Sequence, residues 1–182
     1  MSEKEIEVYC DGSISGATLE DIERHTANFI GRIVVVIPEL NYGLIEKFDD
    51  DLMLPNGHGN FLHAEVVAIR RAGEVCGMKG RELNRRFVIY SDNSDAIRIA
   101  RLSHVKWIGP QERHLADAYL KLVVSRWGYL RRSEGKVHRR RPPTPRHLEL
   151  AQLLNAEHME FQLSESPLFR MFQTEGIPRS YR

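Results

Sequence analysis

Three acidic residues in this 182-residue chain stand where a carboxylate could do chemistry. Asp11 follows the alternating segment IEVYC and precedes a glycine, Glu65 lies near the start of the run HAEVVAI, and Asp92 follows the apolar segment FVIYS. Each has an ordinary alternative role, as a turn residue, as an acid near a helix N-terminus or as a helix cap. Together, at the ends of predicted elements, they indicate converging oxygen ligands for a divalent cation.

The run HAEVVAI also allows a second kind of metal site. His63-Ala64-Glu65 resembles the start of the zinc site of nucleoside deaminases, where the histidine binds zinc and the glutamate transfers protons. That site needs further ligands, usually a Pro-Cys-x-x-Cys motif, but the chain has no cysteine after Cys76. His104 and His114 flank a Gly-Pro break and are poor substitutes. The carboxylate site is therefore favoured, and a deaminase-like protein is the weaker alternative.

The elements that must position these acids follow from the hydrophobic pattern. Alternation predicts strands, an unbroken Ile-Val run predicts a central strand, and apolar residues spaced by three and four predict helices. Gly77 is expected to end the first helix, and Thr144 followed by Pro145 is expected to begin the last. The predicted order is strands within 5–13, 28–40 and 43–48, a helix over 61–76, a strand within 85–93, helices over 94–102 and 111–124, a strand near 127–130 and a helix over 144–155.

Composition restricts the class of protein. The 42% apolar and 28% charged residues are ordinary for a globular protein, and no apolar run approaches the roughly 20 residues that span a bilayer. The start MSEKEIEVYC is charged and alternating, unlike a signal peptide. Two cysteines, Cys10 and Cys76, form no disulfide framework. We therefore expect a cytoplasmic protein without a membrane partner.

Positive charge is concentrated in one segment, although the net charge is only +1. Residues 131–146 carry seven Lys or Arg residues and a single acid, Glu134. Such a block indicates a polyanionic partner, while a solvated basic loop would explain it equally well if this feature stood alone.

In their order along the chain, the acidic motifs resemble those of the ribonuclease H-like superfamily of two-metal nucleases. Its members begin with a strand ending in Asp-Gly-Ser, carry Glu in the first turn of the first helix, and have Asp after the fourth strand. The resemblance covers about residues 5–155 and rests on Asp11-Gly12-Ser13, Ala64-Glu65-Val66-Val67-Ala68-Ile69 and Ser91-Asp92-Asn93.

The resemblance implies an α/β fold. Its mixed five-stranded sheet, a three-strand meander plus parallel strands, would be flanked by helices. Residues 1–155 would form the ribonuclease H-like domain and residues 156–182 a C-terminal extension. Two Mg²⁺ or Mn²⁺ ions would be held by Asp11, Glu65 and Asp92.

A fourth ligand is implied on the last helix, TPRHLELAQLL, where the spacing of the family puts Leu148. Its neighbours His147 and Glu149 are the alternatives. The spacing of His147, Leu150, Ala151 and Leu154 predicts one buried stripe, from which Glu149 would point away. His147 is therefore expected to be the fourth metal ligand and catalytic residue. His138 lacks the flanking glycines of the family's product-release histidine and is a weaker candidate.

The implied activity is endonucleolytic hydrolysis of phosphodiester bonds, with the RNA strand of an RNA–DNA hybrid as the substrate. Arg139, Arg140 and Arg141 would bind phosphates without choosing a sequence. Trp107, Trp127 and Tyr129 are expected to pack in the interior rather than to stack on bases. The alternative is a non-catalytic module that binds nucleic acid, or a protein partner through the hydrophobic C-terminal tail.

Overall fold

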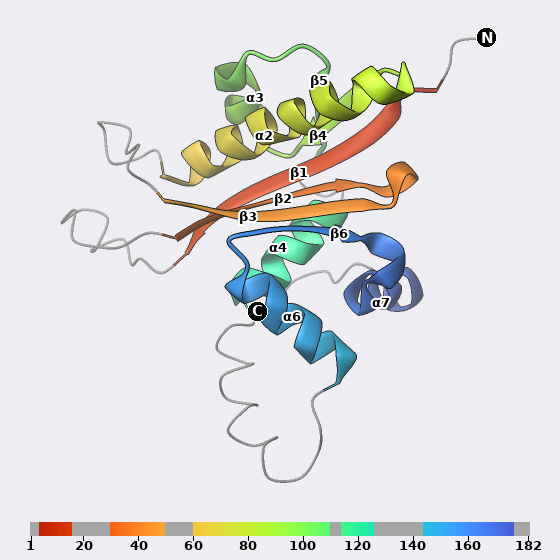
Figure 1. The fold of residues 1–182 in the computed structure, drawn as a ribbon. Coiled ribbons are helices and arrows are strands. Elements are labelled where there is room, and N and C mark those ends of the chain that lie inside the picture. The colour runs from red at the N-terminus through yellow and green to blue at the C-terminus, as the bar shows by residue number, and fades with distance from the viewer. Residues whose placement is uncertain (1–3, 16–29, 50–59, 110–113, 126–143, 177–182) are drawn as a thin grey trace, which may run out of the picture.

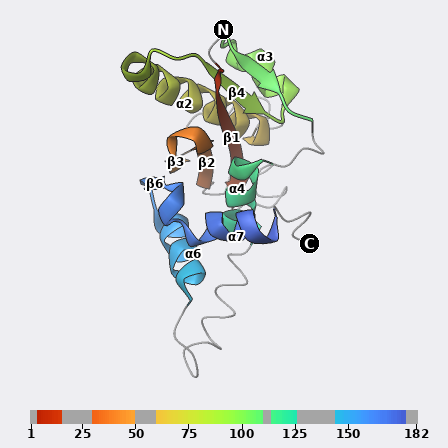
Figure 2. The same cartoon turned by 90° about the vertical axis from the view of Figure 1, so that its right-hand side faces the viewer.

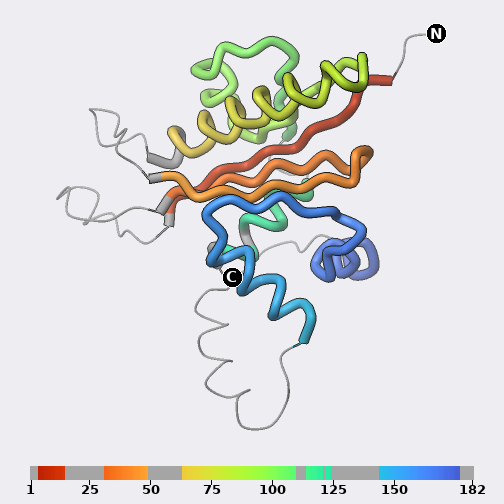
Figure 3. The backbone as a smooth tube through the Cα atoms, viewed as in Figure 1, coloured from red at the N-terminus to blue at the C-terminus, as the bar shows by residue number. Residues whose placement is uncertain are grey.

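The computed structural model describes residues 4–15, 30–49, 60–109, 114–125 and 144–176, whose backbone is drawn in colour in Figure 3. The strand expected near 127–130 and the basic segment up to residue 143 lie outside these residues. The described chain is α/β, with one open mixed sheet flanked by helices (Figure 1).

Six strands form the sheet in the order β5-β4-β1-β2-β3-β6. The first three make an antiparallel meander, β4 runs parallel to β1, β5 runs parallel to β4, and β6 is antiparallel to β3. Their bounds are β1 (Ile6–Ser15), β2 (Ile30–Ile37), β3 (Tyr42–Asp49), β4 (Phe87–Ser91), β5 (Val105–Trp107) and β6 (His158–Gln162).

Helices cover both faces of the sheet (Figures 1 and 2). One face packs against α2 (Asn60–Leu83) and α3 (Ser94–Ala100). The other packs against α4 (Leu115–Ser125), α6 (Pro145–Asn155) and α7 (Pro167–Glu175). Within the described residues, no helix is long and apolar enough to cross a lipid bilayer.

The central strand β2 shows why its sequence is apolar without alternation. Ile33, Val35 and Ile37 belong to the core under α2, while Val34 and Val36 belong to the core on the α4 side. A strand buried on both faces needs an apolar side chain at every position, which matches the run IVVVI.

The predicted count of five strands is wrong, because the described chain has six. Two of the six, β5 and β6, were not predicted, and β6 comes from the segment assigned to the C-terminal extension. Its residues Met159 and Phe161 pack on the α4-side core, and Leu168 and Phe172 of α7 are buried there too. This segment therefore completes one edge of the sheet and covers part of its face.

A buried polar contact fastens α7 to α4 and α6. The hydroxyl of Ser166 donates to the Glu149 carboxylate in a short hydrogen bond, and the Leu168 amide donates to the other oxygen at 2.7 Å. The hydroxyls of Tyr119 and Ser166 are 2.6 Å apart. Glu149 thus accepts main-chain and side-chain hydrogen bonds at the N-terminus of α7, where negative charge is favoured.

Candidate metal centre

Three carboxylates converge where β4 ends beside the middle of β1, which continues past Asp11 to Ser15 instead of ending at Asp11 as expected. Asp11, Glu65 and Asp92 each offer an oxygen, and these oxygens all lie within 4.8 Å of one another. Tyr9 pairs with Tyr90 in the parallel strands β1 and β4. Asp11 and Asp92 each lie two residues further along the chain, so this pairing brings them side by side. The structure therefore brings together the three acids expected from the sequence.

Glu65 lies in the second turn of α2, not in the first turn as expected, because the helix begins at Asn60. It reaches the sheet because Gly12 lets this part of α2 lie directly against β1. A Cβ atom at residue 12 would be 2.2 Å from the carbonyl oxygen of Ala64, far closer than atoms can approach. Any side chain at residue 12 would thus push the helix, and Glu65 with it, away from Asp11. The glycine of the Asp-Gly-Ser motif is needed for this close approach.

Burial and mutual repulsion make the acidic cluster reluctant to ionise. Asp11 is only 6% exposed, and burial, followed by the charge of Glu65, raises its pKa well above the usual range. Burial also raises the pKa of Glu65 to about 7, although hydrogen bonds from Asp11 and the Gly12 backbone oppose the shift. Without a cation, these carboxyl groups therefore ionise at a higher pH than isolated ones.

The donor set fits a hard divalent cation. The Oε2 atom of Glu65 is buried and has no hydrogen-bond partner among the described residues. A buried carboxylate oxygen without a hydrogen-bond partner destabilises the fold unless a cation or a proton compensates its charge. Three converging carboxylates, with no sulfur ligand in the group, are the kind of ligands that Mg²⁺ and Mn²⁺ prefer.

A fourth acid, Asp117, lies beside this cluster and was missed in the sequence. It is 9% exposed and occupies the first turn of α4, which packs against β1. Its negative charge raises the pKa of both Asp11 and Glu65. Asp117 therefore belongs to the electrostatic environment of the candidate metal centre.

A stack of rings holds the start of α4 in place beside the acids. The Asp117 amide donates to the His114 ring nitrogen Nδ1 at 3.2 Å, so His114 caps the helix. The His114 ring stacks on Tyr9 of β1 with centroids 5.8 Å apart, and Tyr9 stacks on Tyr90 of β4 at 5.5 Å. The same two strands that carry Asp11 and Asp92 thus also position Asp117.

The signal for Asp117 is present in the segment HLADAYL. An acid lies between two alanines within an apolar helical run, and both Ala116 and Ala118 are buried. The hydrophobic pattern predicts only a helix over 111–124. An acid inside such a run needs an explanation, because buried carboxylates are uncommon without a partner or a function.

His147 is not part of the group formed by the three acids. Its Nδ1 atom lies 2.7 Å from the Thr144 hydroxyl, at the N-cap of α6. The predicted buried stripe is right at Leu150 and Leu154 but wrong at His147 and Ala151, because the buried residues of α6 are Glu149, Leu150, Leu153 and Leu154. Glu149 does not point away from the core but contacts α7, since the additional elements β6 and α7 pack on a face that the sequence pattern did not reveal.

Other residues considered from the sequence have separate locations. Trp107 is 57% exposed rather than packed in the interior, and its ring N–H donates to the Asp92 main-chain oxygen at 3.2 Å. The ring of His63 contacts Phe48 edge-on, with centroids 6.1 Å apart, and lies outside the acidic group. Arg139, Arg140 and Arg141 fall outside the described residues.

The raised pKa values predict how pH affects the metal-free protein. Glu65 binds its proton more tightly in the folded state, with a pKa of about 7 against an ordinary value of 4.5. The contribution of this group to the free energy of unfolding is therefore expected to fall as pH rises from about 4.5 to 7. Urea unfolding in EDTA at several pH values, compared with Glu65→Gln, measures that contribution.

Magnesium is expected to reduce this loss, because a bound cation compensates the ionised carboxylates. The Glu65→Gln variant should show both a flatter pH dependence and a smaller magnesium effect than the parent protein. A parent protein that gains stability over the variant as pH rises in EDTA would contradict the raised pKa.

The chain matches no protein-family model, no curated protein and no solved structure. The arguments for its function therefore come from the motifs and the geometry of the acidic cluster.

Proposed function

We propose that the protein is a divalent-metal-dependent nuclease of the ribonuclease H-like superfamily that hydrolyses phosphodiester bonds. The observation that carries this proposal is the convergence of Asp11, Glu65 and Asp92 within 4.8 Å. These acids are far apart in sequence and come from the strand, helix and strand that the motif order requires. A purely structural set of acids would gain nothing from being gathered at a buried point.

Asp11, Glu65 and Asp92 would hold the Mg²⁺ or Mn²⁺ ions. Bound there, two such ions would activate a water molecule and stabilise the negative charge of the leaving oxygen. Asp117 adds a fourth negative group beside the ligands and can orient water or strengthen cation binding. The Tyr9–His114 stack and the Gly12 contact keep these groups fixed relative to one another, as efficient catalysis requires.

For the substrate, we propose an endonuclease acting on the RNA strand of an RNA–DNA hybrid, which rests on the resemblance of the motifs. The exposed Trp107 ring beside Asp92 offers an aromatic face on which a base or sugar can stack. The basic segment 131–146 offers cations for phosphates. The alternative is a non-catalytic nucleic-acid- or protein-binding module, for which the C-terminal segment provides a surface.

The test is a cleavage assay with purified protein on labelled hybrid, double-stranded RNA and double-stranded DNA. Each substrate is incubated with Mg²⁺, Mn²⁺ or EDTA. Metal-dependent internal cleavage of the RNA strand in the hybrid supports the proposal as stated. Cleavage of another substrate retains the nuclease activity but rejects the substrate. Binding without cleavage under every metal condition favours the non-catalytic alternative.

Neutralising Arg139, Arg140 and Arg141 to glutamine is expected to weaken substrate binding for all sequences. Each lost phosphate contact should lower the slope of log affinity against log salt concentration by about one, because fewer counterions are released. Fluorescence anisotropy across a salt series, in Ca²⁺ to prevent turnover, measures the slope. A triple variant with the slope and affinity of the parent protein would show that the basic segment is only solvated.

A further inference from the structure

Among the described strands, β6 forms one edge of the sheet and β5 the other. No described strand pairs with the outer side of β6. The amide of Lys47 donates to the Glu157 carbonyl, and that of Leu163 donates to the Asn41 carbonyl. Main-chain groups alternate in direction along an antiparallel pair, so the N–H and C=O groups of His158, Glu160 and Gln162 point away from β3.

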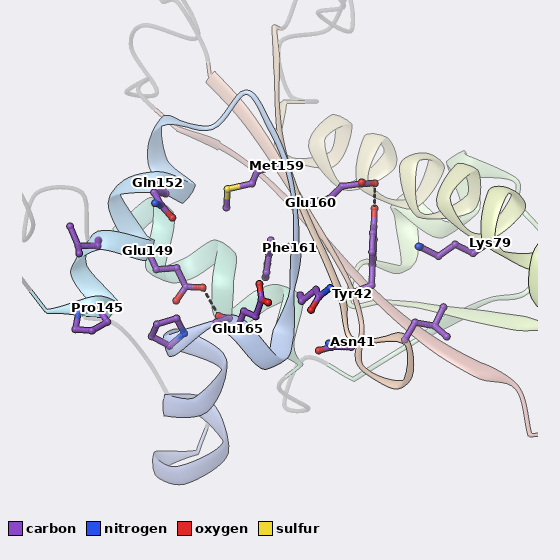
Figure 4. Close-up of a pocket in the computed structure, with 15 residues that line it drawn as sticks. Asn41, Tyr42, Lys79, Pro145, Glu149, Gln152, Met159, Glu160, Phe161 and Glu165 are labelled. Carbon is purple, nitrogen blue, oxygen red and sulfur yellow. Dashed lines mark hydrogen bonds between the residues drawn. The ribbon is translucent and has the colours of Figure 1, made fainter.

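A pocket of about 690 Å³ lies along this edge (Figure 4). On the α6 side its wall includes Leu148, which is 51% exposed, together with Met159 and Phe161 of β6. On the α2 side it includes Tyr42 and Glu160, whose side chains are joined by a 2.8 Å hydrogen bond. The edge therefore has an apolar side and a polar side, as an added strand with alternating side chains would require.

The charges along the pocket favour a basic occupant. Glu160 and Glu165 are exposed carboxylates in its wall. Among the described residues that line the pocket, Lys79 is the one Lys or Arg, and its ammonium group lies 4.1 Å from the centre of the Tyr42 ring. Lysine or arginine side chains facing these glutamates would be favoured over acidic ones.

The same charges disfavour a second copy of this chain. In an antiparallel β6–β6 pair centred on the strand, Glu160 would lie directly opposite Glu160 of the other copy. Like charges in that position destabilise a strand pair, and charged residues on edge strands commonly prevent such association. A different chain with a cationic side chain opposite Glu160 would avoid this repulsion.

We propose that the β6 edge is a docking site for an extended segment of a partner protein in which apolar and basic residues alternate. The segment adds as a strand through the outward main-chain groups of β6. Its apolar side chains contact Leu148 and Met159, and a basic side chain lies opposite Glu160. This site is separate from the metal centre, and its occupation does not depend on the proposed nuclease activity.

The experiment uses the full chain and short fluorescent peptides. One peptide alternates lysine and valine, a second alternates glutamate and valine, and a third is the lysine peptide with N-methyl groups at alternate backbone amides. Binding is measured by anisotropy, and amide hydrogen exchange is followed by NMR. The lysine peptide is expected to bind and to slow exchange at His158, Glu160 and Gln162, leaving Met159 and Phe161 nearly unchanged.

Glu160→Lys is expected to weaken the lysine peptide about tenfold and to improve binding of the glutamate peptide, because the side chain opposite the added strand changes sign. Glu7→Lys carries the same charge change on β1, three strand spacings or about 14 Å from β6, and should leave both affinities unchanged. Circular dichroism of both variants verifies that they fold.

Four results would overturn the proposal. The first is a lysine peptide that binds no better than the glutamate peptide. The second is an N-methylated peptide, with its pairing amides blocked, that binds as well as the parent peptide, which would mean that no strand is added. The third is a Glu7→Lys variant that weakens binding as much as Glu160→Lys, which would mean that only net charge matters. The fourth is protection of the three amides as protein concentration rises without peptide, which would mean that a second copy occupies the edge.

Discussion

Asp11→Asn is expected to slow metal-dependent cleavage by at least about a hundredfold while raising the stability of the metal-free protein. The substitution keeps the size of the side chain but removes a charge from a buried cluster in which Glu65, Asp92 and Asp117 all raise the pKa of Asp11. Loss of a metal ligand is expected to lower kcat by about a hundredfold to a thousandfold, the range found when a group that stabilises transition-state charge is removed. Relief of repulsion should add about 1 kcal/mol to the free energy of unfolding in EDTA.

Single-turnover cleavage rates and urea unfolding in EDTA measure the two effects on the same preparation. Asp95→Asn is the matched control, because Asp95 is an exposed aspartate on α3 that pairs with Arg98 at 3.0 Å. It should change neither quantity appreciably. An Asp11→Asn protein that is both inactive and less stable than its parent would indicate a structural role for Asp11 instead.

Much of the fold could be predicted because buried strands and helices have apolar residues at periodic positions in the sequence. The Ile-Val run of β2, the alternation of β1 and the N-cap pair Thr144-Pro145 of α6 all correspond to observed elements. The first helix continues past Gly77 to Leu83, because one glycine costs a helix only about 1 kcal/mol and packing can offset it. The three-residue strand β5 is partly exposed and too short to show a periodic apolar pattern.

The acids of the candidate site differ in how clearly the sequence reveals them. Asp11 and Asp92 directly follow apolar segments of parallel strands, so their meeting at one edge follows from topology. The position of α4 over β1 is set by long-range packing, including the stack of His114 on Tyr9, which no local pattern encodes. The choice of His147 failed for a related reason, since the face that α6 buries is determined by β6 and α7.

Two variants test which residue, Asp117 or His147, acts as the fourth group at the metal centre. Asp117→Asn is expected to lower kcat by about tenfold to a hundredfold, the effect typical of removing a group that supports metal ligands. It should also raise the Mg²⁺ concentration that gives half the maximal rate, because the cation binds less tightly. His147→Ala should leave both near the parent values, because the His147 ring contacts Thr144 at the helix cap and lies outside the acidic group.

Helix stability must be separated from catalysis in this comparison. The amide of Asp117, not its carboxylate, donates to His114, so Asp117→Asn preserves the capping contact and the fold of α4. His147→Ala removes the side-chain contact with Thr144 but keeps the main-chain cap from residue 147, so any loss of stability should be small. Magnesium titrations of the cleavage rate, with thermal unfolding of both variants, therefore assign the role. If His147→Ala loses metal affinity and Asp117→Asn keeps it, the metal centre extends toward α6 and the role assigned to α4 is wrong.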